Sequence, residues 1–358
     1  MKMEDIARLA NVSKSAVSLA LSGKPGIGAE TRERIIQIAN EHGYEGKAKA
    51  PVSADKLSRS LLFLVFANSG IVLEHYYQQP FFRELIHYIE ERCRSKGFTL
   101  QFTSVDMESI GSIPAIVEEN RSSGVILLGT NLSRQHIADV AEKLPRLVVL
   151  DTCFETLPVS FVEINNAMGA YQAGAYLCGM GHRDIGYIAS NVRIHNFDAR
   201  KQGFEAALRE NGLEIASERT FAVAPTILSS QEAMKEQFER YLATYGKLPT
   251  ALFCECDYIA ISALKTLTEL GQRVPEDVSI VGFDNISEAV IVSPELTTVH
   301  VEKSKLAYSA VDLLVEQIET NADVSVKTRV DTKLVQRLSC RAPGQTARPT
   351  YEKQPERA

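Results

Sequence analysis

The sequence predicts two structural parts: an all-α helix-turn-helix headpiece, and a larger α/β core of two parallel sheets flanked by helices. Short helical patterns separated by loops fill the first fifty residues, and from Ser60 onward strand-length apolar runs alternate with helical segments. The chain has 358 residues, which exceeds the usual size of one domain. The alternating region spans roughly 280 residues, more than one compact core holds, so two sheets are expected.

The headpiece pattern contains three short helices. The first covers residues 3–10, and the second covers residues 14–21 with Ser13 as its N-cap. The third is expected to open at Glu30 or Thr31 and to end at Gly43. A three-residue turn between the first two helices makes this a helix-turn-helix unit, whose second helix would lie in a DNA major groove.

The second helix has one unusual face. Lys14, Ser15, Ser18 and Leu19 fall within one arc of about 140° on a helix of 3.6 residues per turn, while the opposite arc is small and apolar. Serine reads base edges as donor or acceptor, lysine reaches guanine or phosphate, and leucine packs on a thymine methyl. The alternative interpretation is a purely structural helix pair with an incidental surface leucine.

The core pattern is a series of apolar strands, each followed by a helical segment. Ligands in such folds bind beyond the carboxyl ends of the strands. The expected strands are "LLFLVFA", "FTLQFTS", "GVILLG", "LVVLD", "DIGYIA", "ALFCEC" and "VSIVGFD". The expected helices include "FFRELIHYIEERCRSKG", "SRQHIADVAEKL", "NAMGAYQAGAYLCGMGH", "ARKQGFEAALRENG" and "DYIAISALKTLTELG".

Polar residues stand at several of these strand ends. Asp151, Asp257 and Asp284 follow strands, and Arg200 is expected to open a helix. Carboxylates and an arginine around a shared cleft suit a hydroxyl-rich ligand, because they make charge-assisted hydrogen bonds, and Phe81 would cover the apolar face of a sugar. The alternative is that each acid only caps the helix that follows it.

Composition excludes several other classes of protein. Hydrophobic residues make up 45% and charged residues 23%, as in an ordinary soluble globular protein. No apolar run approaches the roughly 18–20 residues of a membrane span, and the amino terminus lacks the apolar region of a signal peptide. We therefore expect a cytoplasmic protein with no membrane partner.

The six cysteines are scattered through apolar stretches, and we expect them to be reduced and mostly buried. "CEC" at 254–256 has the wrong spacing for a zinc knuckle or a redox pair, so neither a metal nor a cofactor is predicted. No nucleophile–base pair and no phosphate-cradling glycine loop occurs at usable spacing, which argues against an enzyme.

The headpiece resembles a known family. "DIARLANVSKSAVSLALSGKPGIGAETRERIIQIANEHGY" is similar to the DNA-binding headpiece of the lactose/galactose-repressor (LacI/GalR) family. "GMGHRDIGYIA", "ARKQGFEAAL", "VPEDVSIVGFDN" and "SPELTTVHVEKSKLAYSAVDLLVEQI" resemble the regulatory core of the same family, which is like periplasmic sugar-binding proteins. The resemblance implies two lobes with three chain crossings, and a transcription regulator, with repression the expected sign.

The resemblance also implies how such a regulator works. A small molecule, a sugar or glycoside, binds between the lobes and switches the affinity for a DNA operator. A homodimer is expected, because two-fold partners read a palindromic operator. The other class considered is a solute-binding protein of a sugar transporter, which shares the core fold but requires an export signal.

The family pattern places site residues on specific positions. The DNA-binding set is Ser13, Lys14, Ser15, Ser18, Leu19, Lys47 and Lys49. The effector-binding set is Phe81, Phe82, Asp151, Arg200, Asp257 and Asp284, with Cys256–Asp257 standing where the family has Asn-Asp.

The predicted domains are a headpiece over 1–46, a linker over 47–60, a core over 61–340 and a disordered tail over 341–358. The lobes are expected at 61–163 with 293–322, and at 164–292 with 323–340.

Two stretches depart from the family pattern. "EGKAKAPVSADKLSRS" has a proline and no leucine where relatives have a hinge helix, so Lys47 and Lys49 either enter a minor groove or belong to a flexible tether, which we favour. The 68–80 loop is longer than usual, and Tyr76 and Tyr77 either line an enlarged cleft or lie in a surface loop. The tail lacks the heptads of a coiled coil.

Overall fold

The computed structural model describes residues 3–21, 27–42, 59–67, 70–73, 75–321 and 324–344. The chain divides into two compact units, residues 1–57 and residues 58–358. Lys47, Lys49, most of the predicted linker and the tail from residue 345 lie outside the described residues. No helix among the described residues is both long and apolar enough to cross a bilayer.

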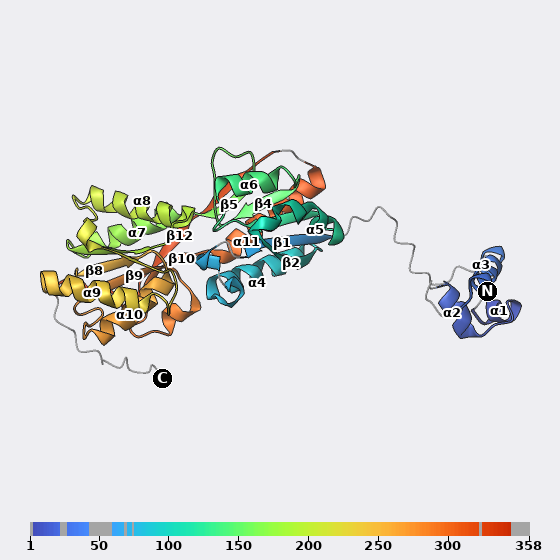
Figure 1. The fold of residues 1–358 in the computed structure, drawn as a ribbon, viewed down its shortest axis with the longest axis horizontal. Coiled ribbons are helices and arrows are strands. Elements are labelled where there is room, and N and C mark those ends of the chain that lie inside the picture. The colour runs from blue at the N-terminus through green and yellow to red at the C-terminus, as the bar shows by residue number, and fades with distance from the viewer. Residues whose placement is uncertain are drawn as a thin grey trace, which may run out of the picture. The chain divides into compact units, whose positions relative to one another are not determined.

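The first unit is a three-helix bundle around a small apolar core (Figure 1). Its centre is formed by Ile6, Val17 and Ile35, all with no exposed surface. The third helix begins at Ala29, earlier than predicted, because the Gly28 carbonyl already accepts the Arg32 N–H at 3.0 Å. The helices are α1 (Met3–Leu9), α2 (Lys14–Leu21) and α3 (Ala29–Glu41).

The first lobe of the second unit contains a wholly parallel six-stranded sheet of order β11-β5-β4-β3-β1-β2. Helices α4 and α11 pack together on one face, and α5 and α6 cover the other. The strands are β1 (Ser60–Ala67), β2 (Thr99–Asp106), β3 (Gly124–Leu128), β4 (Leu147–Leu150), β5 (Ser160–Ile164) and β11 (Lys327–Val330). The helices are α4 (Pro80–Ser95), α5 (Ile113–Glu119), α6 (Arg134–Ala141) and α11 (Lys303–Thr320).

The second lobe repeats this plan with the order β12-β10-β9-β8-β6-β7, in which only β12 runs antiparallel. Helices α7 and α8 lie on one face, and α9 and α10 on the other (Figure 1). The strands are β6 (Ile185–Ser190), β7 (Thr220–Val223), β8 (Ala251–Cys254), β9 (Ser279–Asp284), β10 (Thr297–Val301) and β12 (Thr332–Val335). The helices are α7 (Asn166–Gly179), α8 (His195–Glu210), α9 (Gln231–Tyr245) and α10 (Asp257–Glu269). Short 3₁₀ turns occur at Ile71–Leu73, Tyr76–Gln78, Met107–Ser112, Ser217–Arg219 and Ser287–Val290.

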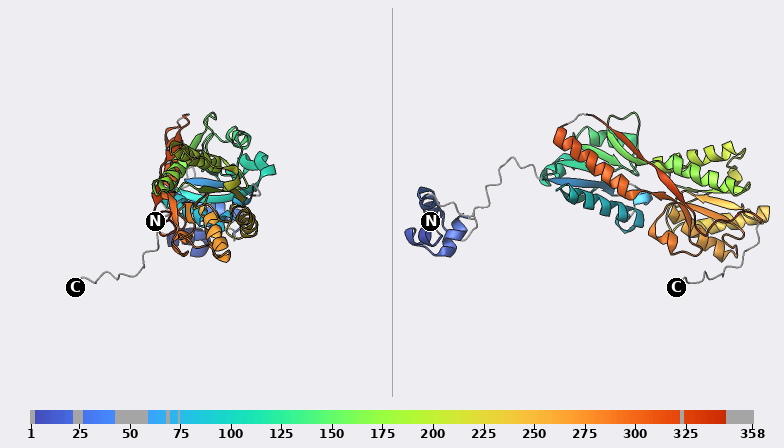
Figure 2. Two further views of the ribbon diagram at one scale, coloured as in Figure 1. Left: turned by 90° about the vertical axis from the view of Figure 1, so that its left-hand side faces the viewer. Right: turned by 180° about the vertical axis from the view of Figure 1, so that it is seen from behind.

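Three chain crossings join the lobes, as expected, and Figure 2 shows them from a second side. They run from β5 to α7, from β10 to α11 and from β11 to β12. Two predicted lobe limits were wrong. The chain returns to the first lobe only after Val301, not at 293, because β10 pairs with β9. It leaves again after Val330, not at 323, because β11 pairs with β5.

Burial follows the apolar pattern of the sequence. The strands β3, β4, β5, β8 and β9 are buried along their whole length, which is typical of parallel strands covered on both faces. The six cysteines are free thiols, and five of them are buried, whereas Cys340 is partly exposed.

Candidate functional site

The predicted DNA-reading face of α2 is accessible in the headpiece. Lys14, Ser15 and Ser18 are exposed and Leu19 is half-buried, while Val17 and Ala20 face the core. Leu19 is therefore not the fully outward residue that the helical arc predicts. Lys14 Nζ lies 2.5 Å from Glu4 Oε1, and both side chains are more than half exposed, so this ion pair contributes little to stability.

Polar contacts hold both ends of α2. Ser13 Oγ accepts the Ala16 N–H at 3.2 Å, which confirms Ser13 as the N-cap, and it also lies 3.2 Å from Ser15 Oγ. At the other end the Arg32 guanidinium of α3 donates to the carbonyls of Leu19 and Ala20 at 3.4 and 3.3 Å. A cation at a helix C-terminus is favourable, and it ties α2 to α3.

The second site is a cavity between the lobes with about 40 Å³ of free space. This is room for only a few water molecules, so a larger ligand enters only if the lobes move apart. Both lobes contribute to its wall. The first lobe supplies Val72, Gln79, Phe81, Phe82, Thr130 and Asp151, and the second supplies Ile194, Asn196, Phe197, Arg200, Pro225, Cys256, Tyr258 and Asp284.

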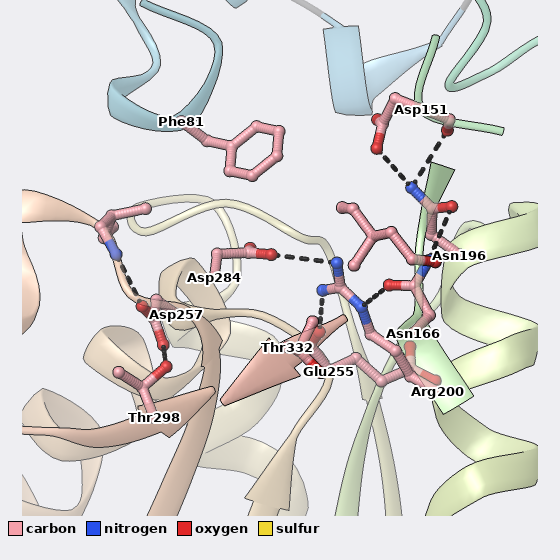
Figure 3. Close-up of polar contacts among 12 residues, drawn as sticks. Phe81, Asp151, Asn166, Asn196, Arg200, Glu255, Asp257, Asp284, Thr298 and Thr332 are labelled. Atoms are coloured by element: carbon pink, nitrogen blue, oxygen red, sulfur yellow. Dashed lines mark hydrogen bonds and ion pairs between the residues drawn. The ribbon is translucent and has the colours of Figure 1, made fainter. Parts of the chain in front are cut away.

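Arg200 is the cationic centre of this cavity (Figure 3). Helix α8 begins at His195, so Arg200 lies in its second turn and not at its start as predicted. The buried guanidinium donates to Asn166 Oδ1 at 2.8 Å, to the Glu255 carbonyl at 2.5 Å and to Asp284 Oδ1 at 3.0 Å. These bonds fix the planar group, so it is preorganised for a polar ligand.

Asp284 ends β9 in a strained backbone conformation. Its φ is 113° and that of Asn285 is 51°, both in the region that residues other than glycine rarely adopt. Burial raises the pKa of the Asp284 carboxyl, while the charges of Arg200 and Lys303 act in the opposite direction. Such strain persists where surrounding contacts impose it, and it is concentrated at functional sites.

Asp151 follows β4 and faces the second lobe. Its carboxylate accepts the Thr130 hydroxyl at 2.6 Å and Asn196 Nδ2 at 3.0 Å. Burial raises the pKa of Asp151 to about 6, although Thr130, Arg200 and Asn196 favour the charged form. The contact with Asn196 joins the two lobes, and Asn166 Nδ2 donates onward to Asn196 Oδ1 at 3.1 Å. One polar network therefore runs through Thr130, Asp151, Asn196, Asn166, Arg200 and Asp284.

Phe81 and Phe82 start α4 on the opposite lobe, as the sequence predicts. Their rings meet edge to face with centroids 5.2 Å apart, and both are buried. Phe81 faces the Arg200–Asp284 pair in the close-up (Figure 3). Its backbone N–H donates to the Tyr258 hydroxyl at 3.3 Å, which is a second contact between the lobes.

Asp257 is the one predicted cleft residue that does not line the cavity. Its carboxylate accepts the Thr298 hydroxyl at 2.6 Å and the Ile286 N–H at 3.0 Å, away from Arg200 (Figure 3). Cys256, the preceding residue, lines the cavity instead. Asp257 thus holds the loop after β9 rather than facing a ligand.

The environment of Asp257 predicts a pH dependence of stability. Burial, followed by the charge of Asp284, raises the pKa of Asp257 to about 8, above the roughly 3.9 of an unfolded chain. Between these values the native protein holds a proton that the unfolded chain has released, so its stability falls as pH rises. The free energy of unfolding should therefore fall by up to about 1.4 kcal/mol per pH unit in this range, and we expect Asp257→Asn to remove this dependence.

Urea unfolding at pH 5, 6, 7 and 8 measures this slope. Asparagine keeps an acceptor for the Ile286 N–H and a donor for Thr298, so the variant should fold. Asp277→Asn is the matched control, because hydrogen bonding to Arg273 lowers the pKa of Asp277 to about 2, below this window. Equal slopes in the wild type and in Asp257→Asn would contradict the assignment.

Several cavity residues were not predicted. Thr130 follows β3 by two residues, so the strand-end rule that selected Asp151 applies to it as well. Asn196 and Tyr258 lie in the first turns of α8 and α10, where nothing in the sequence indicates which side chains turn toward the cleft. Gln79 belongs to the long loop that the sequence did identify.

A cysteine and two glutamates, Cys153, Glu155 and Glu163, place ligand atoms within 4.8 Å of one another. Arg329 already neutralises the carboxylates, with contacts of 2.6 Å to Glu163 and 3.0 Å to Glu155. Burial, together with the two glutamate charges, raises the pKa of Cys153 to about 12, so the thiol stays protonated at neutral pH. The contacts with Arg329 account for both carboxylates, so the cluster is an ion-pair group in this structure.

Comparison with known proteins finds matches for both parts of the chain. Residues 2–46 match the model of bacterial regulatory proteins of the lacI family, and residues 175–340 match a periplasmic binding protein-like domain. The chain is 30% identical over 344 residues to the HTH-type transcriptional repressor PurR of Pasteurella multocida (strain Pm70), covering 95% of this chain and 98% of the relative.

Two further relatives point the same way. The ribose operon repressor of Haemophilus influenzae (strain ATCC 51907 / DSM 11121 / KW20 / Rd) is 30% identical over 334 residues, with 92% of this chain and 95% of the relative covered. A solved complex of the transcriptional regulator CelR with cellobiose matches with a TM-score of 0.69 and 25% identity, covering 95% of this chain and 99% of that one. The chain therefore belongs to the lacI family of bacterial regulatory proteins, and it is a DNA-binding transcriptional regulator.

Proposed function

We propose that this chain is a repressor that binds a palindromic operator as a homodimer. In this proposal, its affinity for the operator changes when a carbohydrate enters the interlobe cavity. The observation that carries the proposal is the buried network from Asp151 through Asn196 to Arg200 and Asp284, which joins the two lobes around the cavity. The names of the relatives, which are repressors, support repression as the sign.

The chemistry of the cavity favours a ligand with many hydroxyl groups. Asp151 and Asp284 accept hydrogen bonds and Arg200 donates them, so a neutral polyol satisfies both kinds of group. The Phe81 ring stands opposite this polar end (Figure 3), where it would cover the apolar face of a sugar ring. Cellobiose in the related CelR complex is a ligand of this type. Binding, not catalysis, is the proposed role.

The cavity also supplies a route from ligand to DNA. A ligand that bonds to both lobes favours one lobe arrangement over another by its difference in affinity for the two. In a dimer, lobe movement changes the spacing of the two headpieces. Both headpieces bind a palindromic operator only when this spacing matches that of its two half-sites. A solute-binding protein of a transporter would share the core, but it has no use for the helix-turn-helix headpiece.

The DNA-binding part of the proposal is tested with the double substitution Lys14→Gln and Ser15→Ala. We expect a change in the preferred operator, with about 1–3 kcal/mol lost at each base pair these side chains read. Because both side chains are exposed, the thermal unfolding midpoint should stay the same. The measurement is a binding-site selection from random duplexes with the full chain, followed by affinities for the selected sites.

A matched control is Arg8→Gln on α1, which changes an exposed headpiece charge outside the reading face. It should leave the selected sequence unchanged. An unaltered operator preference in the Lys14/Ser15 variant would remove these residues from the reading set. If the wild-type chain selects no sequence at all, the proposal that it binds a specific operator is wrong.

A further inference from the structure

We propose that the effector of this chain has two linked sugar rings, and that the outer ring occupies a second pocket beyond the mouth of the interlobe cavity. The inference rests on the proposed carbohydrate effector and adds the size class of the ligand. It concerns a site built by the long loop before α4 and by the second lobe.

The outer pocket has about 690 Å³ of free space, compared with about 40 Å³ in the inner cavity. Gln79, Pro225 and Tyr258 line both spaces, so the two pockets are adjacent and share this part of their walls. Arg200 and Asp284 line only the inner cavity. In this proposal, a ligand that is anchored at Arg200 and is longer than one ring extends past Gln79 and Tyr258 into the outer pocket.

The wall on the first lobe comes from the 75–80 segment. His75 and Gln78 present an imidazole and an amide to the pocket, and Pro80 adds an apolar surface. The backbone of His75 is left-handed, with φ 50°, and its Nδ1 lies 3.3 Å from the Tyr77 hydroxyl. The ring thus has a definite orientation at the pocket edge.

The sequence leaves two roles open for the tyrosines of this loop, a cleft wall or a surface loop, and the structure does not favour the cleft wall. Neither Tyr76 nor Tyr77 lines the outer pocket. Tyr76 packs against the apolar core, and Tyr77 meets both Tyr76 and His75 edge to face, with centroids 5.7 and 6.0 Å apart. The tyrosines support the loop, and His75 and Gln78 are the residues that face a ligand.

The wall on the second lobe is a loop after β7 together with a turn after β9. The loop supplies the hydroxyls of Thr226 and Ser229, whose oxygens lie 2.7 Å apart, and the turn supplies the Glu288 carboxylate. Leu228 is 77% exposed although it lines the pocket. An exposed leucine beside hydroxyls, an amide and a carboxylate suits a sugar ring, which has apolar faces and a polar edge.

The test compares matched sugars on the full-length protein by calorimetry. The probes are glucose with cellobiose and maltose, and galactose with lactose. We expect at least one disaccharide to bind tenfold or more tightly than its monosaccharide. The double variant His75→Ala/Gln78→Ala should reduce that advantage below threefold while the monosaccharide affinity stays unchanged.

A second variant tests the opposite wall. Ser229→Trp fills the outer pocket from an exposed position, so it should fold and should also weaken only the disaccharide. The control variant is Gln135→Ala. Gln135 is an exposed residue of α6 that lines neither pocket, so this variant should bind both sugars as the wild type does.

The outcomes separate the two proposals. Equal affinity for mono- and disaccharides, or equal loss of both in the variants, overturns the outer site and leaves the carbohydrate effector in place. Binding of none of the five sugars by the wild-type protein overturns the outer sugar site and the carbohydrate effector together. Operator binding measured on the same samples reports on the headpiece independently.

Discussion

Asp284→Ala is expected to abolish the effector response while operator binding remains. Among the described residues, Asp284 is the only acidic side chain that forms an ion pair with the Arg200 guanidinium. A hydrogen bond to a charged group contributes about 1.5–3 kcal/mol, so losing the bond from a ligand to Asp284 should lower effector affinity at least ~10-fold. The headpiece is a separate compact unit, so its affinity for DNA without effector should be unchanged.

Calorimetry with an effector found in the sugar panel measures the first part, and operator affinity with and without that sugar measures the second. Asp277→Ala is the matched control, because Asp277 pairs with Arg273 on the surface, outside the cavity. A thermal melt shows whether Asp284→Ala folds. Normal effector binding by a folded Asp284→Ala protein would remove Asp284 from the site.

The second large effect is expected from Gly203→Ala, which should destabilise the core by about 3 kcal/mol or more. A Cβ at Gly203 would lie 2.0 Å from the Ala167 carbonyl oxygen and 2.7 Å from its Cα. These are backbone atoms of α7 and have no side-chain freedom to move aside. Helix α8 would have to shift away from α7, and Arg200, one turn earlier on α8, would shift with it.

Chemical unfolding of the protein measures this loss, and effector affinity should fall in parallel because Arg200 and Asn166 separate. Gly179→Ala is the matched control. Gly179 ends α7, and a Cβ there meets no atom within 4 Å, so alanine should be neutral or slightly stabilising. An unchanged unfolding midpoint in Gly203→Ala would show that the two helices tolerate a wider spacing.

Much of the fold follows from the apolar pattern. The seven predicted strands all occur, and six of them are buried along most of their length, whereas the edge strand β2 is mostly exposed or half-buried. The missed elements include β7, of four residues with an exposed Ala222, and β11, whose residues alternate between exposed and half-buried. Short edge strands carry little apolar signal, because only one side of their surface needs burial.

The lobe limits could not be read from local pattern. β10 is followed directly by α11, so the sequence suggests one continuous segment, yet the strand pairs with β9 and the helix packs on α4. Which sheet a strand joins is decided by its partners, which are distant in sequence. Only the structure places the crossing between Val301 and Lys303.

The site was predicted where strand ends decide the direction of a side chain. Asp151 follows β4 and Asp284 ends β9, and both line the cavity, where Arg200 of α8 contacts Asp284. Asp257 follows β8 by the same rule but turns toward Thr298, because the Ile286 N–H and the Thr298 hydroxyl satisfy it there. Proximity to a strand end therefore selects candidates without fixing which of two sides they serve.

Each crossing passes between the lobes as a single strand of chain, and neither sheet extends into the other lobe. Rotating one lobe relative to the other therefore breaks no backbone hydrogen bond within either sheet. The energy of this movement depends on a small number of bonds between the lobes, such as Asn196 to Asp151 and Phe81 to Tyr258. Bonds of that kind contribute about 0.5–1.5 kcal/mol each. A small metabolite that bonds to both lobes makes a similar number of such bonds. Its binding energy is therefore of the right size to decide which lobe arrangement the core adopts.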